Sequence, residues 1–466
     1  MTNDNPEQRA PRISVIGTGY LGATHAAAMA EMGFEVIGVD TDPNKVDALS
    51  QGIVPFYEPG LPELLRKHVG TGQLRFTTDI EAATAFADVH FVCVGTPQQS
   101  TSFAANLSYV EDATRQVAKH LTHDGLIVGK STVPVGTAAR LRGIVQENLP
   151  AGVTAELVWN PEFLREGKAV QDTLAPDRLV LGGTTAASEA MLRTVYAEPI
   201  ANGTPVLVMD LPTAELVKVS ANAFLATKIS FINAISEVCA AVGADVTLLA
   251  DALGHDVRIG RQFLNAGLGF GGGCLPKDIR ALMHRSNELG AHSASDLLQQ
   301  VDEINMRQRQ LVIDHALAAC GGSVLNRRIG VLGAAFKPDT DDVRDSPALN
   351  VAAALQLRGA QVTVYDPQAT SSAARIFPAL GYADSAATAI QGADVVLVLT
   401  EWPEFVEADP NEFGALVKTR SVVDGRNCLD GERWAAAGWS VRTIGRAPVQ
   451  GSNSSAAAGQ GAFAFA

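Results

Sequence analysis

Residues 269–278 read Gly-Phe-Gly-Gly-Gly-Cys-Leu-Pro-Lys-Asp and form the strongest candidate for covalent chemistry in the chain. Their glycine content and polarity predict a loop, because glycine lets a ligand approach the main chain closely. Cys274 in such a loop is a candidate nucleophile. Lys277 and Asp278 follow where a cation could hold a thiolate and a carboxylate could transfer protons. The alternative is a mobile linker with an incidental cysteine.

A second candidate pair lies in an apolar stretch from residue 213 to about 242, which contains no Pro or Gly. This stretch predicts one long helix, capped by residues 210–213. Lys218 and Asn222 are one turn apart and share a face of that helix. A lysine in such a helix is usually solvated. On the same face as a reactive thiol, however, the two donors could stabilise a developing oxyanion.

The first part of the chain contains a nucleotide-binding pattern. A short apolar strand over 12–16 leads into Gly17-Thr18-Gly19-Tyr20-Leu21-Gly22, an Ala-rich helical segment and a strand over 35–39. This is the dinucleotide fingerprint in its required context, with the pyrophosphate at a helix N-terminus. Asp40 ends the second strand and can accept from the adenosine ribose. Its carboxylate repels a 2′-phosphate, so NAD is favoured over NADP; Lys45 either reaches the same ribose or is solvated.

Hydroxyl residues follow two further predicted strands, over 89–94 and 126–129. Ligands of parallel sheets bind at the carboxyl ends of strands, so Thr96 and Thr132 are candidate site residues. The run Gly129-Lys130-Ser131 is not a P-loop, because position 124 holds Asp where the motif requires Gly.

Residues 160–166, Asn-Pro-Glu-Phe-Leu-Arg-Glu, have the composition of a helix start. Asn160 suits the N-cap and Pro161 suits the first helical position. In such a helix Glu162 and Glu166 would share one face. They are either candidate site carboxylates or residues favoured by the helix dipole.

The last third of the chain repeats the first in outline. Residues 33–40 are echoed by 359–366, and residues 87–94 by 393–400. A second doubly wound unit is therefore expected. Its first strand, 328–332, leads to a loop without the phosphate-binding glycines but with Lys337 and Arg344, and Arg426 follows a later strand. These cations suit the diphosphate of a different nucleotide.

Composition limits the possible functions. A formal net charge of −14 over 466 residues leaves no basic excess for nucleic acid or an anionic membrane. The five cysteines are widely spread and include no Cys-x-x-Cys pair, so neither a disulfide framework nor a metal site is expected. The polar first residues and the lack of an uninterrupted span-length apolar run predict a cytoplasmic protein without a membrane segment.

We therefore expect an α/β protein with two doubly wound Rossmann-like domains, joined by a central helical region with one long helix. The expected segments are a disordered N-terminus (1–11), an NAD-binding domain (12–210), a helical domain with the cysteine loop (211–321), a second nucleotide-binding domain (322–446) and a disordered tail rich in Ala, Gly and Ser (447–466).

These motifs together resemble the nucleotide-sugar 6-dehydrogenases of the UDP-glucose/GDP-mannose dehydrogenase family, over roughly residues 12–446. The resemblance implies that Cys274 is the nucleophile, assisted by Lys218 and Asn222. It also implies that the water-activating or acid–base groups are Thr132, Glu162 and Asp278. Residue 273 is Gly where the family commonly has Ser or Tyr, and the tail has no counterpart.

The resemblance implies binding residues and partners as well. The NAD contacts would be Gly17, Gly19, Tyr20, Leu21, Gly22, Asp40, Lys45, Thr96, Thr132, Glu166, Lys277 and Arg344, with Glu166 beside the nicotinamide. The UDP-sugar contacts would be Glu162, Phe163, Leu164, Lys218, Asn222, Phe263, Leu264, Asn265, Ala266, Gly267, Gly271, Phe336, Lys337 and Arg426, with Arg258 contributed to the neighbouring subunit of a homodimer or higher homo-oligomer.

The implied reaction is a four-electron, NAD-dependent oxidation of UDP-glucose to UDP-glucuronate through a cysteine thiohemiacetal and thioester. GDP-mannose or UDP-N-acetylmannosamine are alternative substrates. A two-electron 3-hydroxyacid dehydrogenase would share the fingerprint but needs neither Cys274 nor a second nucleotide unit. A non-catalytic nucleotide-sugar-binding module would have no reason to keep Cys274, Lys218 and Asn222 together.

Overall fold

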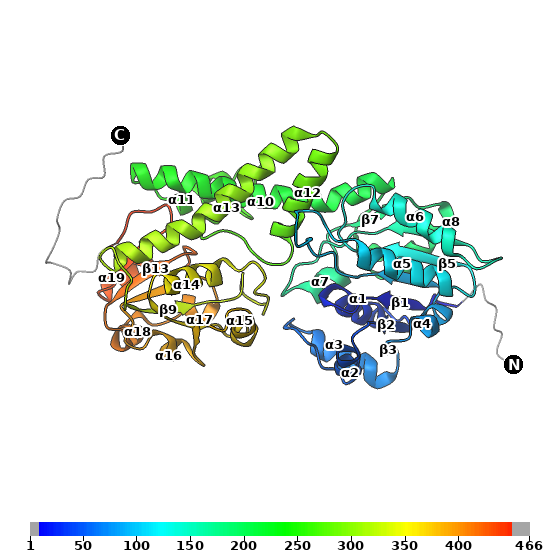
Figure 1. Cartoon of the computed structure of the whole chain (residues 1–466), viewed down its shortest axis with the longest axis horizontal. Coiled ribbons are helices and arrows are strands. Elements are labelled where there is room, and N and C mark those ends of the chain that lie inside the picture. Colours follow the sequence, from blue (N-terminus) through cyan, green and yellow to red (C-terminus); the bar gives the residue numbers. More distant parts are fainter. Residues whose placement is uncertain (1–8, 450–466) are drawn as a thin grey trace. The chain divides into compact units, whose positions relative to one another are not determined.

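The computed structural model describes residues 9–449 (Figure 1). The disorder predicted for 1–11 and 447–466 falls mostly outside this range. The chain separates into two compact units: one combines the residues up to Ala223 with Lys277–Asp296, and the other combines Phe224–Pro276 with the residues from Leu297 onward. The segment boundaries predicted near 210 and 321 stay a prediction.

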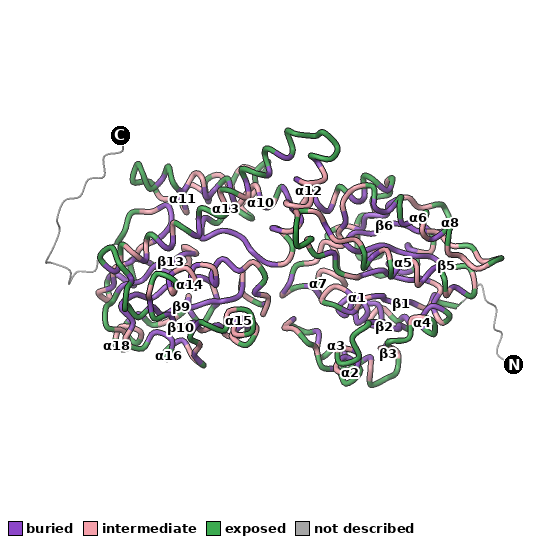
Figure 2. The backbone as a smooth tube through the Cα atoms, viewed as in Figure 1, coloured by how far each residue is buried: buried purple, intermediate pink, exposed green. Residues whose placement is uncertain are grey.

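The first unit is built on an eight-stranded sheet of order β3-β2-β1-β4-β5-β6-β7-β8. Neighbouring strands are parallel except β6 and β7, which meet antiparallel at Trp159 and Gly182. The strands are β1 (Ile13–Ile16), β2 (Val36–Val39), β3 (Leu74–Thr77), β4 (Val89–Val92), β5 (Gly125–Gly129), β6 (Ala155–Trp159), β7 (Leu179–Gly182) and β8 (Val206–Met209). The central strands are buried, as the tube in Figure 2 shows, because helices cover both faces of the sheet.

Two hydrophobic clusters mark the two faces of this sheet. Ala23 and Ala27 belong to one, and Val110, Val117 and Leu141 belong to the other. The helices are α1 (Tyr20–Glu31), α2 (Pro43–Ser50), α3 (Leu61–Thr71), α4 (Ile80–Phe86), α5 (Ser108–His120), α6 (Thr137–Asn148), α7 (Ala169–Leu174), α8 (Ala186–Val195) and α9 (Ala197–Ala201). The strand–helix alternation confirms the doubly wound fold predicted from the sequence.

The helix predicted to begin at Pro161 is wrong. Residues 160–168 have no regular structure, and α7 begins only at Ala169. The amide of Arg165 donates to the carboxylate of Asp172 at 2.8 Å, and the amide of Gly167 donates to Glu58 at 2.7 Å. The carboxylates of nearby Asp172 and of Glu58, far back in the sequence, thus accept from amides that would otherwise donate to helix carbonyls.

The second unit contains a six-stranded, wholly parallel sheet of order β11-β10-β9-β12-β13-β14. Its strands are β9 (Arg328–Leu332), β10 (Gln361–Tyr365), β11 (Gly381–Tyr382), β12 (Val395–Val398), β13 (Ser421–Asp424) and β14 (Ser440–Thr443). Its short helices are α11 (Val246–Gly254), α14 (Pro347–Leu357), α15 (Thr370–Ile376), α16 (Ala386–Ile390), α17 (Pro403–Val406), α18 (Pro410–Leu416) and α19 (Gly431–Ala436). The second Rossmann-like sheet is therefore confirmed.

Three long helices complete the chain: α10 (Leu211–Val242), α12 (Leu275–Glu288) and α13 (His292–Ala319). As predicted, Asp210 caps α10, accepting from the amide of Thr213 at 2.7 Å. By length and composition α10 could cross a membrane, and among the described residues no other helix passes that test. One such helix is weak evidence for a span, because the core helix of a soluble protein passes as well. The cytoplasmic location stays a prediction.

The cysteine loop is shorter than predicted. We expected a loop through Asp278, but α12 begins at Leu275, so Lys277 and Asp278 lie in its first turn. Pro276 is compatible with this position, because amides of the first turn have no helical partner. Cys274 consequently immediately precedes a helix N-terminus.

Candidate active site

The fingerprint turn leaves no room for a side chain at Gly17 or Gly22. The amide of Gly17 donates to Val39 at 2.8 Å, and Gly17 has φ +88°, a conformation that favours glycine. A Cβ at Gly22 would lie 1.8 Å from the carbonyl oxygen of Gly17, whereas nothing lies within 4 Å of a Cβ at Gly19. The turn is tight where it meets α1 and open at Gly19, as a dinucleotide pyrophosphate requires.

Asp40 follows β2 and is buried. Its carboxylate accepts from the Thr18 amide at 3.0 Å and from the Lys45 ammonium at 2.8 Å. Burial acts to raise the pKa of Asp40, but the bonds from Lys45 and from backbone amides outweigh it, and the pKa is lowered. Asp40 is therefore ionised at neutral pH, and Lys45 contacts it directly.

Thr96 and Thr132 meet at the carboxyl ends of β4 and β5. The Thr96 hydroxyl donates to the carbonyl of Thr132 at 2.6 Å. Thr132 also lines a cavity of about 10 Å³ with Lys277 and Asp278. Four predicted site residues from three parts of the chain thus lie close together in the first unit.

Two polar groups on α10 are buried and paired with carboxylates. The Lys218 ammonium lies 3.1 Å from Glu162, and the Asn222 amide donates to Asp278 at 2.7 Å. The other carboxylate oxygen of Asp278 accepts from Lys277 at 2.7 Å. The exposed fractions are 5% for Lys218, 7% for Asn222 and 2% for Asp278, so these polar side chains are held away from bulk water. Buried acid–cation pairs of this kind suit proton transfer.

The sequence reasoning missed a buried network behind Glu162. The Lys130 ammonium donates to the side chains of Asn160 at 2.9 Å and Tyr196 at 3.3 Å. Burial lowers the pKa of Lys130 to about 8, with Cys93 and Glu162 acting in the opposite direction. The network fixes Asn160 and so the start of the irregular segment 160–168. Lys130 itself could have indicated this network, because it is a cation directly after a buried strand.

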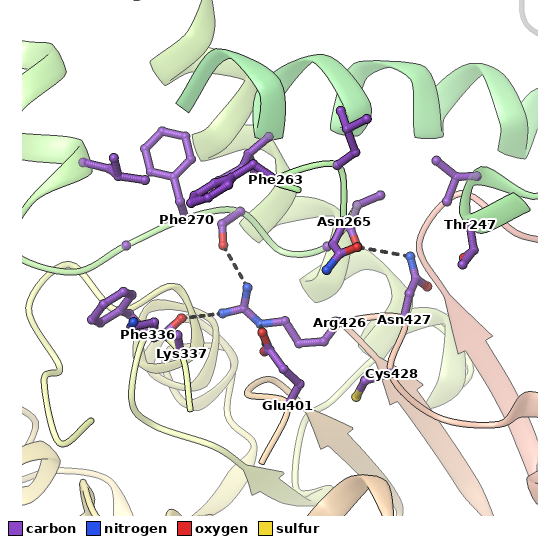
Figure 3. Close-up of a pocket in the computed structure, with 18 of the residues that line it drawn as sticks. Thr247, Phe263, Asn265, Phe270, Phe336, Lys337, Glu401, Arg426, Asn427 and Cys428 are labelled. Atoms are coloured by element: carbon purple, nitrogen blue, oxygen red, sulfur yellow. Dashed lines mark hydrogen bonds and ion pairs between the residues drawn. The ribbon is translucent and has the colours of Figure 1, made fainter. Parts of the chain in front are cut away.

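The second unit contains a cavity of about 510 Å³ (Figure 3). Nine residues predicted to bind the sugar nucleotide line it: Phe263, Leu264, Asn265, Ala266, Gly267, Gly271, Phe336, Lys337 and Arg426. The sequence reasoning missed other lining residues, among them Thr247, Arg261 and Asn427. Arg261 and Asn427 are each within two residues of a predicted one, which is the signal that could have found them.

Arg426 organises this cavity. Its guanidinium donates to the carbonyls of Leu399 at 2.8 Å, Phe336 at 2.9 Å and Gly269 at 3.1 Å, and lies 3.3 Å from Glu401. Figure 3 shows it between the Phe336 and Phe270 sides of the cavity. Backbone carbonyls from three loops therefore hold one planar cation at the cavity wall, which suits a diphosphate.

In the cysteine loop, a side chain at Gly271 would meet backbone, whereas one at Gly273 would meet the movable end of Arg344. A Cβ at Gly271 would lie 2.3 Å from the carbonyl oxygen of Asp345, and one at Gly273 would lie 2.2 Å from the guanidinium carbon of Arg344. The Gly272 amide donates to the Arg344 carbonyl at 2.9 Å. Gly273, the departure from the family pattern, thus leaves room for an arginine. Cys274 ends the loop with an exposed side chain at the positive end of α12, which favours a thiolate.

Arg258 and Arg344, two predicted contacts in the second unit, do not line this cavity. Arg258 is paired with Asp256 at 2.6 Å and is 85% exposed. Arg344 is paired with Asp342 at 2.7 Å and is 60% exposed. Their proposed roles, toward a neighbouring subunit and toward NAD, stay predictions.

The predicted site residues divide between the two units. The first unit holds the fingerprint, Asp40, Lys45, both threonines, residues 162–166, Lys218, Asn222, Lys277 and Asp278; the second holds Cys274, Arg258, Arg344 and the cavity residues. The approach of Cys274 to Lys218 and Asn222 stays a prediction.

Comparison with known families accounts for most of the chain. Residues 11–200 match the NAD binding domain of the UDP-glucose/GDP-mannose dehydrogenase family, residues 212–307 its central domain, and residues 330–431 its UDP binding domain.

Individual relatives agree with these matches. The chain is 42% identical over 445 residues to UDP-glucose 6-dehydrogenase TuaD of Bacillus subtilis, covering 95% of each chain. It is 40% identical to UDP-glucose 6-dehydrogenase of Rhizobium meliloti, covering 93% of this chain and 99% of the relative. The solved UDP-glucose dehydrogenase of Pyrobaculum islandicum is 36% identical with a TM-score of 0.87, covering 96% of this chain and 100% of that one.

Proposed function

The chain belongs to the UDP-glucose/GDP-mannose dehydrogenase family and is an NAD-dependent oxidoreductase, and we propose that it oxidises the C6 alcohol of UDP-glucose to a carboxylate. The observation that supports the cysteine mechanism is the exposed side chain of Cys274, directly before α12 on a loop whose backbone leaves no room for a side chain at Gly271. Such a loop presents a thiol to a ligand and favours its anionic form.

NAD fits the first unit. The open backbone at Gly19 and the N-terminus of α1 would hold the pyrophosphate, and the ionised Asp40 would accept from the ribose. When bound, the nicotinamide supplies the hydride acceptor.

Cys274 makes the four-electron outcome possible. The alcohol loses a hydride and a proton to give an aldehyde, and the Cys274 thiolate adds to its carbonyl carbon, forming a thiohemiacetal. Loss of a second hydride and a proton gives the thioester. Water then attacks the thioester carbon and the thiolate leaves, so one alcohol, one water and two NAD give one carboxylate, two NADH and three protons. Covalent capture prevents the aldehyde from dissociating.

The proton-handling roles fall to the paired carboxylates of the first unit. Glu162, held 3.1 Å from Lys218, and Asp278, held by Asn222 and Lys277, would accept the protons and activate water. Lys218 and Asn222 would stabilise the alkoxide-like oxygens, worth about 2.7 to 4 kcal/mol per donor in comparable oxyanion holes.

The cavity around Arg426 would bind the sugar nucleotide. Its volume of about 510 Å³ is in the usual range for small-molecule sites. We favour UDP-glucose as the substrate because the three relatives described above, which are 42%, 40% and 36% identical to this chain, are named UDP-glucose dehydrogenases. GDP-mannose and UDP-N-acetylmannosamine are the alternatives, and the solved UDP-D-ManNAc dehydrogenase of Pyrococcus horikoshii is 26% identical to this chain.

A homodimer or higher homo-oligomer is part of the proposal. Phe224, Phe231 and Val238 recur at intervals of seven along α10 and are 65%, 49% and 57% exposed. Seven-residue spacing puts them on one helix face. An exposed apolar stripe of this kind supports self-association, with Arg258 reaching the neighbouring subunit.

Stoichiometry tests the proposal. Purified protein with excess NAD and limiting UDP-glucose should form two NADH and one UDP-glucuronate per sugar. NADH is measured by its absorbance and UDP-glucuronate by its mass. One NADH per sugar, or stoichiometric trapping of free aldehyde by an added amine, would favour a two-electron enzyme. Two NADH with GDP-mannose or UDP-N-acetylmannosamine but none with UDP-glucose would change the substrate and keep the mechanism.

Replacement of the thiol separates chemistry from recognition. Cys274→Ala should abolish net conversion to the uronic acid while calorimetry still detects binding of NAD and UDP-glucose. Loss of both ligands would make the loop structural, and binding without catalysis in the wild type would indicate a non-catalytic module.

A further inference from the structure

Glu58 is a buried carboxylate that no step above uses. It lies between α2 and α3, two residues before the Gly60 N-cap of α3, and is 2% exposed. In the described part of the chain no ammonium or guanidinium group pairs with it. Burying an unpaired carboxylate is costly unless several hydrogen-bond donors converge on it.

Three donors converge on Glu58. The amides of Gly167 and Ala169 donate to it, each at 2.7 Å, one to each carboxylate oxygen. The Tyr20 hydroxyl donates to the oxygen that Gly167 also contacts, and the Gly167 amide additionally lies 3.0 Å from the Tyr20 oxygen. Burial, and secondarily the bond to Glu58, raise the pKa of Tyr20 far above its usual range, so its hydroxyl remains a donor.

These bonds join two parts of the proposed active site. Tyr20 belongs to the fingerprint and is the first residue of α1. Gly167 directly follows Glu166 and ends the segment that carries Glu162. Glu58 itself comes from a third place in the chain, the loop between α2 and α3.

The segment needs such an anchor because it has no regular structure of its own. Its start is held by Asn160, which bonds to Lys130. Its end has a left-handed backbone at Gly167, φ +81°, and is held by Glu58. Charge-assisted bonds are shorter and stronger than neutral ones, so they suit an irregular segment that must keep one geometry.

We propose that Glu58 is a positioning residue that fixes the backbone beside Glu166 relative to the NAD fingerprint. This inference rests on the proposed function in one respect, the placement of Glu166 beside the nicotinamide. Glu58 would act through Tyr20 and the amides of Gly167 and Ala169, without touching substrate. Misplacement of a reacting group by about 1 Å can cost ~100-fold in rate.

Glu58→Gln tests the inference, because the amide keeps the size of the side chain but replaces one acceptor with a donor that faces N–H groups. We expect kcat to fall ~10- to 100-fold. The Kd for NAD should rise about tenfold or more, because the bonds by which Glu58 holds Tyr20 of the fingerprint are weakened. The Kd for UDP, whose cavity lies in the second unit, should stay within twofold. Glu63→Gln is the matched control, because Glu63 is an exposed carboxylate of α3 that is paired with Arg66.

Two further variants protect the test against simple loss of folding. Tyr20→Phe removes one donor from Glu58 and should lower kcat less than Glu58→Gln does. In a Glu166→Gln background, Glu58→Gln should lower kcat by a smaller factor than in the wild type, because Glu58 is proposed to act on kcat by positioning Glu166. A structural role would instead lower the folded fraction, measured by circular dichroism, and leave the kinetic constants of the folded enzyme unchanged.

Three outcomes would overturn the inference: kinetic constants of Glu58→Gln within twofold of wild type, a fall that matches the loss of folded protein, or multiplicative effects of Glu58→Gln and Glu166→Gln on kcat. The NAD affinity needs no sugar substrate. A wild type that fails to oxidise any nucleotide sugar would therefore contradict the proposed function, while unchanged NAD binding in Glu58→Gln would contradict this inference alone.

Discussion

Six strands of the first sheet have the same order as the six strands of the second, but the segments that follow the first strand of each sheet differ. Strands β3-β2-β1-β4-β5-β6 correspond in order to β11-β10-β9-β12-β13-β14. In both, the amide of the glycine after the first strand, Gly17 or Gly333, donates at 2.8 Å to the last residue of the adjacent strand. The backbone arrangement of the two sheets is therefore the same as far as Gly17 and Gly333.

Beyond that point the sheets differ. In the first, α1 begins three residues after Gly17; in the second, α14 begins only at Pro347. Asp366 occupies the place of Asp40, but it accepts from the Trp402 ring at 3.0 Å and from the amides of Ala334, Ala335, Gln368 and Ala369. Five donors satisfy the Asp366 carboxylate, and none of them is a lysine like Lys45 beside Asp40.

The largest expected effect comes from closing the turn of the first sheet. Gly22→Ala would put a Cβ 1.8 Å from the carbonyl oxygen of Gly17, and backbone atoms cannot move aside cheaply. We expect NAD-dependent activity to fall ~100-fold or more. UDP binding, measured by calorimetry, should be unchanged. Gly143→Ala, inside α6 with nothing within 4 Å of the added Cβ, is the control. Loss of UDP binding as well would contradict separate nucleotide sites.

The next effect comes from making the second sheet resemble the first. Gly129 pairs with the last residue of β4, and Asp424 pairs with the last residue of β12, so these two positions are equivalent. Ser131 and Arg426 each lie two residues further on and are therefore equivalent as well. Arg426→Ser should raise the Kd for UDP by ~10- to 100-fold, because UDP would lose its bonds to the charged guanidinium. The Kd for NAD should not change. Equal weakening of both would indicate general unfolding, which a thermal melt would reveal.

The same substitution at Asp40 and at Asp366 tests whether only the first sheet binds the dinucleotide. Asp40→Asn should lower the NAD to NADP ratio of kcat/KM by about tenfold, about 1.4 kcal/mol, because it removes the repulsion of a 2′-phosphate. Asp366→Asn should leave that ratio unchanged and cost about 1.5 to 3 kcal/mol of unfolding free energy, because it disturbs a satisfied buried acceptor. A changed ratio in Asp366→Asn would mean that the second sheet also binds the dinucleotide.

The sequence predicted those parts of the molecule that depend on local pattern. Apolar strands followed by glycine, the Asp40 position and the long helix α10 depend on neighbouring residues, and the structure has each of them. The predicted helix at Pro161 is wrong because two carboxylates outside it, Asp172 and the sequence-distant Glu58, accept from its amides. Glu58 and Lys130 were overlooked for the same reason: their importance lies in contacts with residues that the sequence does not place beside them.

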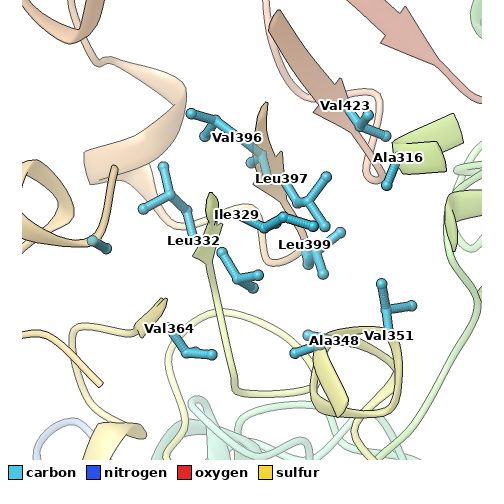
Figure 4. Close-up of a cluster of buried hydrophobic side chains, with 14 of the residues drawn as sticks. Ala316, Ile329, Leu332, Ala348, Val351, Val364, Val396, Leu397, Leu399 and Val423 are labelled. Carbon is cyan, nitrogen blue, oxygen red and sulfur yellow. The ribbon is translucent and has the colours of Figure 1, made fainter. Parts of the chain in front are cut away.

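The smallest expected effect concerns a polar pair inside the first sheet. Ser14 on β1 and His90 on β4 are fully buried neighbours, with 2.8 Å between the serine oxygen and the ring Nδ1. The register puts Gly330 and Val396 at these places in the second sheet, whose apolar core Figure 4 shows with Val396 labelled. Burial, and secondarily the charge of His123, lower the pKa of His90 to about 3.

The sign of the pH effect follows from this lowered pKa. Between pH 6.5 and 3 an unfolded histidine binds a proton while His90 in the folded state does not, so acidification favours unfolding. From pH 6.5 to 5.5 this one group should remove about 1 kcal/mol of unfolding free energy, because the unfolded pKa is near 6.5. The double variant Ser14→Ala/His90→Val should lose less stability than the wild type over that interval by this amount, measured by urea unfolding at the two pH values. His292→Gln, which removes an exposed ring, should retain the wild-type difference. Equal slopes for the wild type and the double variant would mean that His90 is protonated in the folded protein, and the first sheet would then carry a buried charge that the second does not.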